Sequence, residues 1–328
     1  MNVPGDLPAV DVFFLAAGLG SRLRPLTLKY PKPCVPFLNV PMGLYHFRFL
    51  EQLKISSCVA NTFHLPEQIE KLFAAQPYYK GKVSISEEGQ NRQILGSAGG
   101  LKRAAKLFSD EDNVLMLNAD EVFFTKDNLF LQKAYAQHIK NNNFATLVVT
   151  NHAEAGKKFG AIWANKKKVK DIGKKIDRPN LDPALKPYHY VGMIFLNKKI
   201  MSLIPENQES NIFYDILINQ LNNSSVEVYN LDCRWFETGN AVDYFAATKT
   251  MLESLDDETL KFINGYDPSR VVKNAEGVSL ISNSVSLDEK KLFGFNAISK
   301  SANIKNLKDR VDNSILFENE SLNTEYFL

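Results

Sequence analysis

The first 150 residues alternate short apolar runs with segments of helical periodicity, and this alternation constrains the fold more than any other feature. The apolar runs predict strands at 10–17, 57–63, 83–86, 114–117 and 145–150. Helical spacing of apolar residues predicts helices between them at 42–54, 66–75, 97–108 and 128–140. Alternating strands and helices form right-handed βαβ units. The sequence therefore predicts an α/β fold with a doubly wound, mostly parallel sheet of the Rossmann-like type.

The remaining residues predict a return to the sheet and then a small extension. We expect an antiparallel hairpin from 159 to 175 with the lysine run 166–168 at its solvated tip. A strand at 190–196 and helices at 212–221 and 240–255 follow. After a polar connector, short apolar pieces occur at 278–281, 285–287, 293–298, 304–307 and 315–317. The sequence thus predicts a domain at 1–255 and a β-rich extension at 256–328, for which a degenerate left-handed β-helix and a two-sheet packing both fit.

Composition excludes several classes of protein. The 328 residues are 45% hydrophobic and 23% charged, as in ordinary globular proteins. The net charge of +2 excludes whole-surface attraction to nucleic acid or to an anionic membrane. Cys34, Cys58 and Cys233 are too widely spaced for a disulfide framework or a zinc site. With no signal-like N-terminus and no membrane-length apolar stretch, we expect a reduced, cytoplasmic protein without nucleic-acid or membrane partners.

The segment after the first predicted strand combines glycines with a dense group of cations. Gly18 and Gly20 let the backbone N–H groups approach a ligand, and Ser21 adds a hydroxyl donor. Arg22, Arg24 and Lys32 lie within about a dozen residues, between prolines that stiffen the loop. The third glycine of a dinucleotide fingerprint is absent, and so is a Walker A loop. The segment therefore predicts a phosphate-binding loop of another kind.

Candidate site segments follow predicted strands at three places. They are residues 18–24, 87–100 and 118–120. Ligands of doubly wound sheets bind beyond the carboxyl ends of the strands, so we expect these segments to meet. Asp120 would repel a nucleotide unless a cation lay between them, which suggests a metal ligand. A turn or helix-capping role is the alternative for this residue.

Five segments resemble the sugar-1-phosphate nucleotidyltransferases. LAAGLGSRLRPLTLKYPKP (15–33) resembles the long signature of that family. Four further matches follow in the family's order: LGSAGGLKRA (95–104), LNAD (117–120), YVGMIFL (190–196) and WFETGN (235–240). The resemblance covers about residues 10–250 and leaves the extension unexplained.

The resemblance implies that a sugar 1-phosphate attacks the α-phosphorus of an NTP and that pyrophosphate leaves. Arg22 would stabilise the leaving pyrophosphate, Lys32 would neutralise the reacting phosphates, and Asp120 would bind Mg²⁺. Gly192 and Arg178 would contact the sugar phosphate. The nucleotide would be held by residues of two segments: Ala16, Ala17, Gly18, Gly20 and Ser21, with Gly96, Ser97 and Gly99.

Two departures from the family pattern leave alternatives open. Glu237 stands where the family has a metal-binding Asp, and it is a second candidate ligand; Asn240 replaces a Thr. Arg178 aligns only softly with the family's phosphate-contacting Lys, so Lys174 or Lys175 is an alternative. The expected activity is guanylyl transfer to a mannose- or heptose-type 1-phosphate. The alternatives are uridylyl or thymidylyl transfer, and a non-catalytic nucleotide-sugar-binding regulatory subunit; the extension is a candidate surface for a homo-oligomer.

Overall fold

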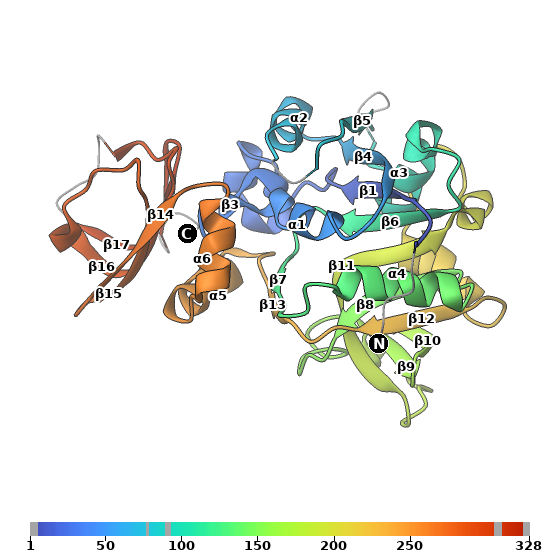
Figure 1. The fold of residues 1–328 in the computed structure, drawn as a ribbon. Helices are drawn as coiled ribbons and strands as arrows, with labels where there is room; N and C mark the ends of the chain where they lie inside the picture. Colours follow the sequence, from blue (N-terminus) through green and yellow to red (C-terminus); the bar gives the residue numbers. More distant parts are fainter. Residues whose placement is uncertain (1–5, 77–78, 89–92, 305–309, 324–328) are drawn as a thin grey trace. The chain divides into compact units, whose positions relative to one another are not determined.

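The computed structural model describes residues 6–76, 79–88, 93–304 and 310–323 (Figure 1). The chain divides into two compact units, each built from two separate stretches of sequence. The first unit comprises Met1–Gly18 and His46–Trp235, and the second comprises Leu19–Tyr45 and Phe236–Leu328. Because the units interleave along the chain, they do not test the linear boundary expected at residue 255, which stays a prediction.

The first unit is built on a nine-stranded sheet with the order β5-β4-β1-β6-β11-β8-β12-β10-β9. Its strands are β1 (Val10–Leu15), β4 (Ile55–Thr62), β5 (Val83–Glu87), β6 (Asn113–Asn118), β8 (Ala145–Thr150), β9 (Ala161–Asn165), β10 (Lys168–Gly173), β11 (Lys186–Asn197) and β12 (Val226–Asn230). A separate two-stranded sheet pairs β7 (Val122–Phe124) with β13 (Arg234–Phe236).

The sheet is mixed rather than mostly parallel. Strands β5, β4, β1 and β6 are parallel neighbours, as the βαβ pattern predicts. Strand β11 then runs antiparallel to both β6 and β8, and the hairpin β9–β10 is antiparallel as well. The expectation of a mostly parallel sheet is therefore correct for the first half of the sheet. In the second half β8 and β12 are parallel, but β11 and the hairpin β9–β10 run antiparallel to their neighbours, where βαβ crossovers were expected.

Helices lie on both faces of the sheet, which confirms the doubly wound arrangement (Figure 1). They are α1 (Phe47–Leu50), α2 (Pro66–Ala74), α3 (Gly96–Ala104) and α4 (Phe130–Lys140). Successive side chains of a strand point to opposite faces. On β1, Phe13 shares a buried cluster with α3, whereas Phe14 contacts Phe47 and Phe73 from α1 and α2.

Two predicted helices, at 42–54 and 212–221, are broken into shorter turns. Residues 42–54 form a 3₁₀ turn (η4, Met42–Leu44) and the four-residue α1, because most of the segment's side chains are buried and tertiary packing overrides the helical spacing. Residues 212–221 form a π-helical turn (η9, Ile212–Ile216) and a 3₁₀ turn (η10, Leu217–Gln220). The described residues of the first unit also contain the short helices η6 (Ala105–Leu107), η7 (Lys175–Asp177) and η8 (Lys198–Leu203).

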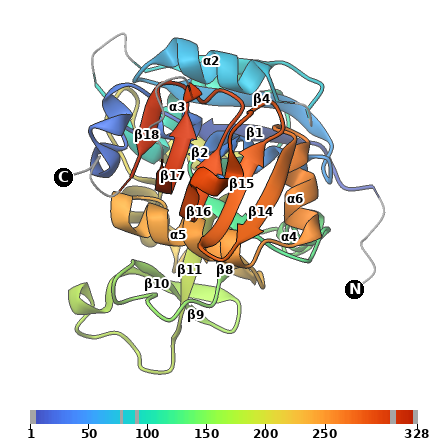
Figure 2. The same cartoon turned by 90° about the vertical axis from the view of Figure 1, so that its left-hand side faces the viewer.

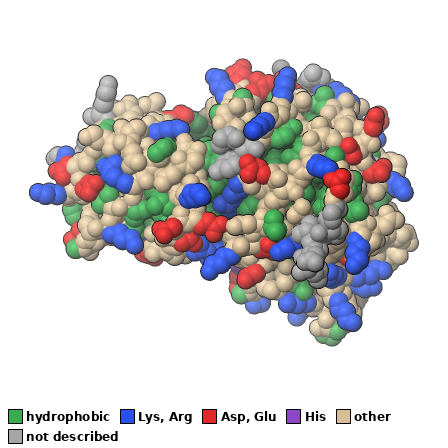
Figure 3. Space-filling view, viewed as in Figure 1, with side chains coloured by type: hydrophobic (Ala, Val, Ile, Leu, Met, Phe, Trp, Pro, Cys, Tyr) green, Lys and Arg blue, Asp and Glu red, His purple; other side chains and the backbone are tan. Residues whose placement is uncertain are grey.

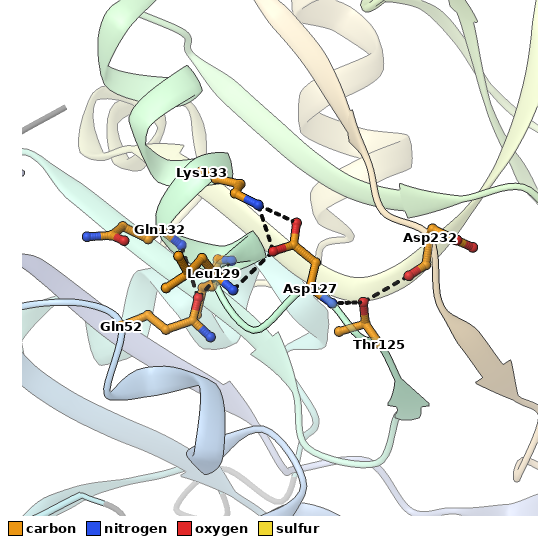
Figure 4. A network of polar contacts seen from close by, with 8 residues as sticks. Gln52, Thr125, Asp127, Leu129, Gln132, Lys133 and Asp232 are labelled. Atoms are coloured by element: carbon orange, nitrogen blue, oxygen red, sulfur yellow. Dashed lines mark hydrogen bonds and ion pairs between the residues drawn. The ribbon is translucent and has the colours of Figure 1, made fainter. Parts of the chain in front are cut away.

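The start of α4 is held by a polar network (Figure 4). Gln52 Oε1 accepts the N–H groups of Leu131 and Gln132, at 3.1 and 3.3 Å, which have no partner within the helix. Asp127 accepts from Leu129 N–H and pairs with Lys133 at 2.7 Å. The first turn of α4 is therefore capped by side chains from outside the helix.

The hairpin β9–β10 carries the lysine run at its tip, as predicted. Residues 166–168 are exposed, and Lys and Arg side chains gather over this hairpin on the face in Figure 3. Such a cluster of solvated cations is the ordinary state of a charged hairpin tip. Elsewhere in the described ranges, no helix combines the length and apolar character needed to cross a bilayer. Within the described residues, Cys34, Cys58 and Cys233 form no disulfide.

The second unit combines the glycine- and proline-rich loop with the C-terminal residues. The loop contains η1 (Ser21–Leu23), η2 (Leu26–Leu28), η3 (Lys32–Cys34), β2 (Pro36–Phe37) and β3 (Val40–Pro41). The C-terminal part contains α5 (Ala241–Glu253), α6 (Asp257–Asn264), η11 (Glu289–Lys291) and a five-stranded sheet. Its strands are β14 (Ser269–Asn274), β15 (Gly277–Ser282), β16 (Leu292–Ile298), β17 (Val311–Phe317) and β18 (Glu320–Leu322) (Figure 2).

The β-rich extension is confirmed, but a left-handed β-helix is not. Strands β15, β16 and β17 are parallel neighbours, while β14 and β18 pair antiparallel at the two sides of the same sheet. The expected piece 285–287 is not a strand, and 305–307 lies outside the described residues. The polar connector contains α6, which the sequence analysis missed; Asp256 caps this helix by accepting Thr259 N–H at 2.8 Å.

Candidate functional site

The carboxyl ends of β1 and β6 lie side by side in the first unit. The two strands are parallel neighbours, with Leu15 opposite Asn118, and Ala119 N–H donates to the Leu15 carbonyl at 3.0 Å. Ala16–Gly18 therefore leave β1 next to the turn that carries Asp120, which is partly exposed. The register of the sheet thus brings Gly18, the first residue of one predicted site segment, near the segment 118–120.

A buried polar pair supports the backbone after β1. Asn61 at the end of β4 accepts the N–H groups of Ala16 and Ala17 with Oδ1, at 2.7 and 3.2 Å. Its Nδ2 donates to Glu88 Oε1 at 2.6 Å, and Glu88 Oε2 accepts Leu95 N–H at 2.9 Å. Burial raises the pKa of Glu88, while these hydrogen bonds and the Arg103 charge oppose the shift. Glu88 is 1% exposed, so its charge depends on these partners.

The glycines of α3 are required by neighbouring backbone. Gly96 has φ +70°, and a Cβ built on it would lie 2.6 Å from the Ser210 carbonyl oxygen. A Cβ on Gly99 would lie 2.5 Å from the Gln208 carbonyl oxygen. Ser97 Oγ accepts Ile212 N–H at 2.9 Å. These residues hold α3 against 208–212, and their expected contact with a nucleotide stays a prediction.

Gly192 lies at an irregularity of β11, where the pairing with β8 shifts between Tyr190 and Met193. It has φ +86°, and a Cβ there would lie 2.6 Å from Glu121 Cγ and 3.3 Å from Asn118 Cβ. The glycine therefore gives room to side chains that follow β6. Its expected contact with a sugar stays a prediction.

An aromatic cluster lies near Gly192 and was missed by the sequence analysis. The rings of His189 and Trp235 are 4.0 Å apart, and His152 and Phe159 contact both of them. Trp235 Nε1 donates to Glu121 Oε2 at 2.7 Å. Burial, together with the His152 charge, lowers the pKa of His189 to about 4. The cluster therefore presents a neutral imidazole at physiological pH.

Behind Asp120, His46 is fully buried against the Phe123 ring. Burial and the Arg48 charge lower its pKa to about 3, although Asn118 and Asp120 act in the opposite direction. This burial indicates a packing role for His46.

Arg178 is engaged by its own hairpin. Its Nε donates to Asp171 Oδ1 at 2.9 Å, and its Nη2 donates to the Ile172 carbonyl at 2.5 Å. Lys174 and Lys175 are exposed on the same loop. Arg178 is thus already paired within this loop, and its contact with a sugar phosphate stays a prediction, with Lys174 and Lys175 as the alternatives.

The predicted phosphate loop folds within the second unit. Gly20 has φ +59°, and its carbonyl accepts Thr27 Oγ1–H at 2.9 Å and Leu23 N–H at 2.9 Å. Lys32 begins η3 and is 8% exposed; its Cβ would lie 3.2 Å from a Cβ on Gly20. Ser21 and Arg22 are exposed. Of these two cations, Lys32 is therefore buried and Arg22 is exposed.

Arg22 and Glu237 meet at Gly239 in the same unit. A Cβ on Gly239 would collide with Glu237 Oε1 and would lie 2.6 Å from Arg22 Nη2. Glu237 Oε1 accepts Gly239 N–H at 2.5 Å. Asn240 caps α5 by accepting Asp243 N–H at 3.0 Å, which explains an amide at that position. The tight turn at Gly239 therefore brings the predicted guanidinium and the second candidate carboxylate together.

The candidate carboxylates Asp120 and Glu237 fit only a metal site in which water and substrate supply most of the ligands. Within the described ranges, no three His, Cys, Asp or Glu side chains gather as a metal cage. Mg²⁺ commonly takes one or two carboxylates and fills its remaining positions with water and substrate phosphates. Asp120 suits that mode of binding, and Glu237 remains the second candidate.

The sequence analysis did not single out Asn61, and it contained Glu88 only as part of the candidate segment 87–100. Both are polar residues at or just after the ends of strands β4 and β5, so the rule that directed attention to Asp120 could have found them.

Comparison with known proteins gives concordant matches. A family model described as nucleotidyl transferase matches residues 12–254. A mannose-1-phosphate guanyltransferase of Eremothecium gossypii is 32% identical over 254 residues, 74% of this chain and 64% of that protein. A UTP–glucose-1-phosphate uridylyltransferase of a Synechocystis species is 28% identical over 255 residues, 74% of this chain and 63% of that protein. The chain thus spans a little under two thirds of these relatives.

Solved structures share the fold. UDP-glucose pyrophosphorylase from Acinetobacter baumanii has a TM-score of 0.64 and 18% identity, over 78% of this chain and 97% of that one. HddC from Yersinia pseudotuberculosis, complexed with GMP-PN, has a TM-score of 0.55 and 19% identity, over 74% and 99%.

Proposed function

The chain belongs to the nucleotidyl transferase family, and from this premise we propose that it transfers a nucleotidyl group from an NTP to a sugar 1-phosphate. A phosphate oxygen of the sugar 1-phosphate attacks the α-phosphorus, the bond between the α-phosphorus and the bridging oxygen breaks, and pyrophosphate leaves. The observation that carries the proposal is the adjacency of the Ala16–Gly18 backbone and Asp120 at neighbouring strand ends. Similarity to the guanyltransferase of Eremothecium gossypii favours guanylyl transfer onto a mannose- or heptose-type 1-phosphate.

The residues of this chain would bind and orient charged groups rather than transfer protons. The backbone after β1 would hold the nucleotide, while Arg22 and Lys32 would neutralise the phosphates. Asp120, with Glu237 as the second candidate, would hold Mg²⁺, which when bound supplies charge neutralisation at phosphate oxygens. A cytoplasmic location and a homo-oligomer through residues 256–328 stay predictions.

Pyrophosphate release from a panel of four NTPs crossed with several sugar 1-phosphates tests the proposal. We expect turnover with GTP and mannose 1-phosphate or a heptose 1-phosphate, and loss of about 10²–10³-fold in kcat on Arg22→Ala. Asp120→Ala should lose most of kcat at saturating Mg²⁺, while Lys166→Ala, at the hairpin tip, should not change it. Turnover only with UTP or dTTP would move the base assignment. Nucleotide-sugar binding without turnover across the whole panel would replace the enzyme by a regulatory binding protein.

A further inference from the structure

Asn61 and Glu88 form a buried chain of hydrogen bonds that links three elements of the first unit. The chain begins at the N–H groups of Ala16 and Ala17, passes through the Asn61 amide and the Glu88 carboxylate, and ends at Leu95 N–H, just before α3. Asn61 and Glu88 are each 1% exposed. Every atom of this chain therefore depends on its protein partners for hydrogen bonding.

The direction of the hydrogen bonds fixes the orientation of the Asn61 amide. Two backbone N–H groups require an acceptor, so Oδ1 must face Ala16 and Ala17. Nδ2 must then donate, and it faces Glu88 Oε1 at 2.6 Å. Glu88 accepts from N–H donors on both oxygens, which is the pattern of an ionised carboxylate. The carboxylate thus determines which way the amide points, and the amide determines where the backbone after β1 lies.

The packing of α3 leaves room for this pair. A Cβ built on Gly100 would lie 2.5 Å from Glu88 Oε1 and 2.6 Å from Asn61 Nδ2. The second glycine of the segment SAGG is therefore required by the pair, and α3 closes over it. A helix, two strand ends and the turn after β1 converge on two polar side chains.

We propose that Asn61 and Glu88 are positioning residues, which hold the Ala16–Ala17 backbone and the start of α3 in the arrangement that receives the nucleotide. The proposal rests on the function proposed above, because it assigns the nucleotide to those two segments. Neither side chain needs to touch the substrate. Their effect passes through the backbone N–H groups that they orient, which fits the general need of a binding site for a rigid supporting layer.

Exchanging the two polar groups tests the proposal with side chains of nearly equal size. Asn61→Asp places two carboxylates against each other, and Glu88→Gln turns an amide N–H₂ toward one of two N–H donors. The double variant restores every bond: the new carboxylate at position 61 would accept from both alanine N–H groups and from the new amide at position 88, whose oxygen would accept from Leu95. We expect each single variant to raise KM for the NTP about tenfold or more, and the double variant to return within about threefold of wild type.

Asn143→Asp is the matched control. Asn143 is 2% exposed in the same unit, just before β8, at the opposite end of the strands from Asn61. Its Nδ2 donates to Thr146 Oγ1 at 3.0 Å, and its Oδ1 accepts Ser225 Oγ–H at 2.6 Å. This variant should lower the thermal midpoint without raising KM for the NTP. If the single variants at 61 and 88 lowered the midpoint but left KM unchanged like the control, the positioning role would be wrong.

Hydrogen exchange at Ala16 and Ala17 separates this proposal from the proposed function. Exchange at both amides should speed up in each single variant and slow again in the double variant, whether or not any substrate pair is turned over. If no substrate pair were turned over but this exchange pattern were seen, the enzyme assignment would be wrong, while the role of Asn61 and Glu88 in supporting the backbone would stand. If KM for the NTP and amide exchange at Ala16 and Ala17 both stayed raised in the double variant, hydrogen-bond direction would not govern the position of this backbone.

Discussion

Replacing Gly18 by alanine tests whether the turn after β1 approaches a nucleotide. The change should leave the stability of the fold nearly unaltered, so that an effect on activity can be attributed to nucleotide binding. Gly18 is exposed, and a Cβ built on it meets no heavy atom of the described residues within 4 Å. Its φ is not positive. Alanine narrows the conformations of the unfolded chain, so the free energy of unfolding should stay equal or rise by up to about 1 kcal/mol.

The loss of function should be much larger than the change in stability. A hydrogen bond to a charged group contributes about 1.5–3 kcal/mol, and a Cβ on Gly18 would push a phosphate away from the backbone donors. That energy corresponds to a decrease of about 10- to 150-fold in kcat/KM for the NTP. Pyrophosphate release measures kcat/KM for the NTP, and thermal unfolding measures the change in stability.

Gly20→Ala is the contrasting variant. Gly20 has φ +59°, and a Cβ there would lie 2.9 Å from Thr27 Cγ2. The left-handed backbone alone costs alanine about 1–2 kcal/mol, so this variant should lose stability and activity together. A Gly18→Ala protein with wild-type kcat/KM would refute the assignment of the nucleotide to this turn.

Two further predictions concern stability. Burial lowers the pKa of His138 to about 4, whereas an unfolded histidine titrates near 6.5, so the unfolded chain binds the proton more tightly and stability falls as pH drops from about 6.5 to about 4. Between neutral pH and pH 5, His138 alone should lower the free energy of unfolding, measured in urea, by about 2 kcal/mol. If His138→Gln lost stability with pH as steeply as the wild type, this assignment would be contradicted. Glu320, whose side chain is 7% exposed, pairs with the half-exposed Lys29 at 2.8 Å. Glu320→Gln should lower the thermal midpoint by about 2–4 °C, and an unchanged midpoint would show that the pair contributes nothing.

The parallel half of the sheet could be predicted because its signals are local. Strand β1 is buried along its length between two parallel neighbours, and such a strand has a continuous apolar sequence. Pro66 begins α2, as its place at the first turn indicates. The antiparallel half was harder, because strand direction depends on which segments pair, and β11 pairs with strands that begin 40 or more residues earlier.

The misses have a common physical origin in tertiary contacts and caps. Residues 42–54 have the spacing of a helix with one apolar face, but most of their side chains are buried. An amphipathic surface helix would leave its other face in water, so the spacing predicted the wrong structure here. Helix α6 carries its signal in Asp256 and the acidic residues after it, a start that is read from polar residues rather than from periodicity. The candidate site shows the same division: the place of Asp120 after a strand is a local signal, while the hydrogen bond between Asn61 and Glu88 is a tertiary contact that no local pattern predicts.

The glycines of the two segments predicted to bind the nucleotide are required for different physical reasons, and this decides how variants there can be interpreted. In α3, an added Cβ would collide with the Ser210 carbonyl at Gly96, with the Gln208 carbonyl at Gly99, and with the pair Asn61–Glu88 at Gly100. A larger residue at any of them disturbs the fold before a ligand is considered, so lost activity there cannot be attributed to a ligand contact. Gly18 meets no such neighbour among the described residues. Of these four glycines it is therefore the one at which folding and nucleotide binding can be separated by a single methyl group.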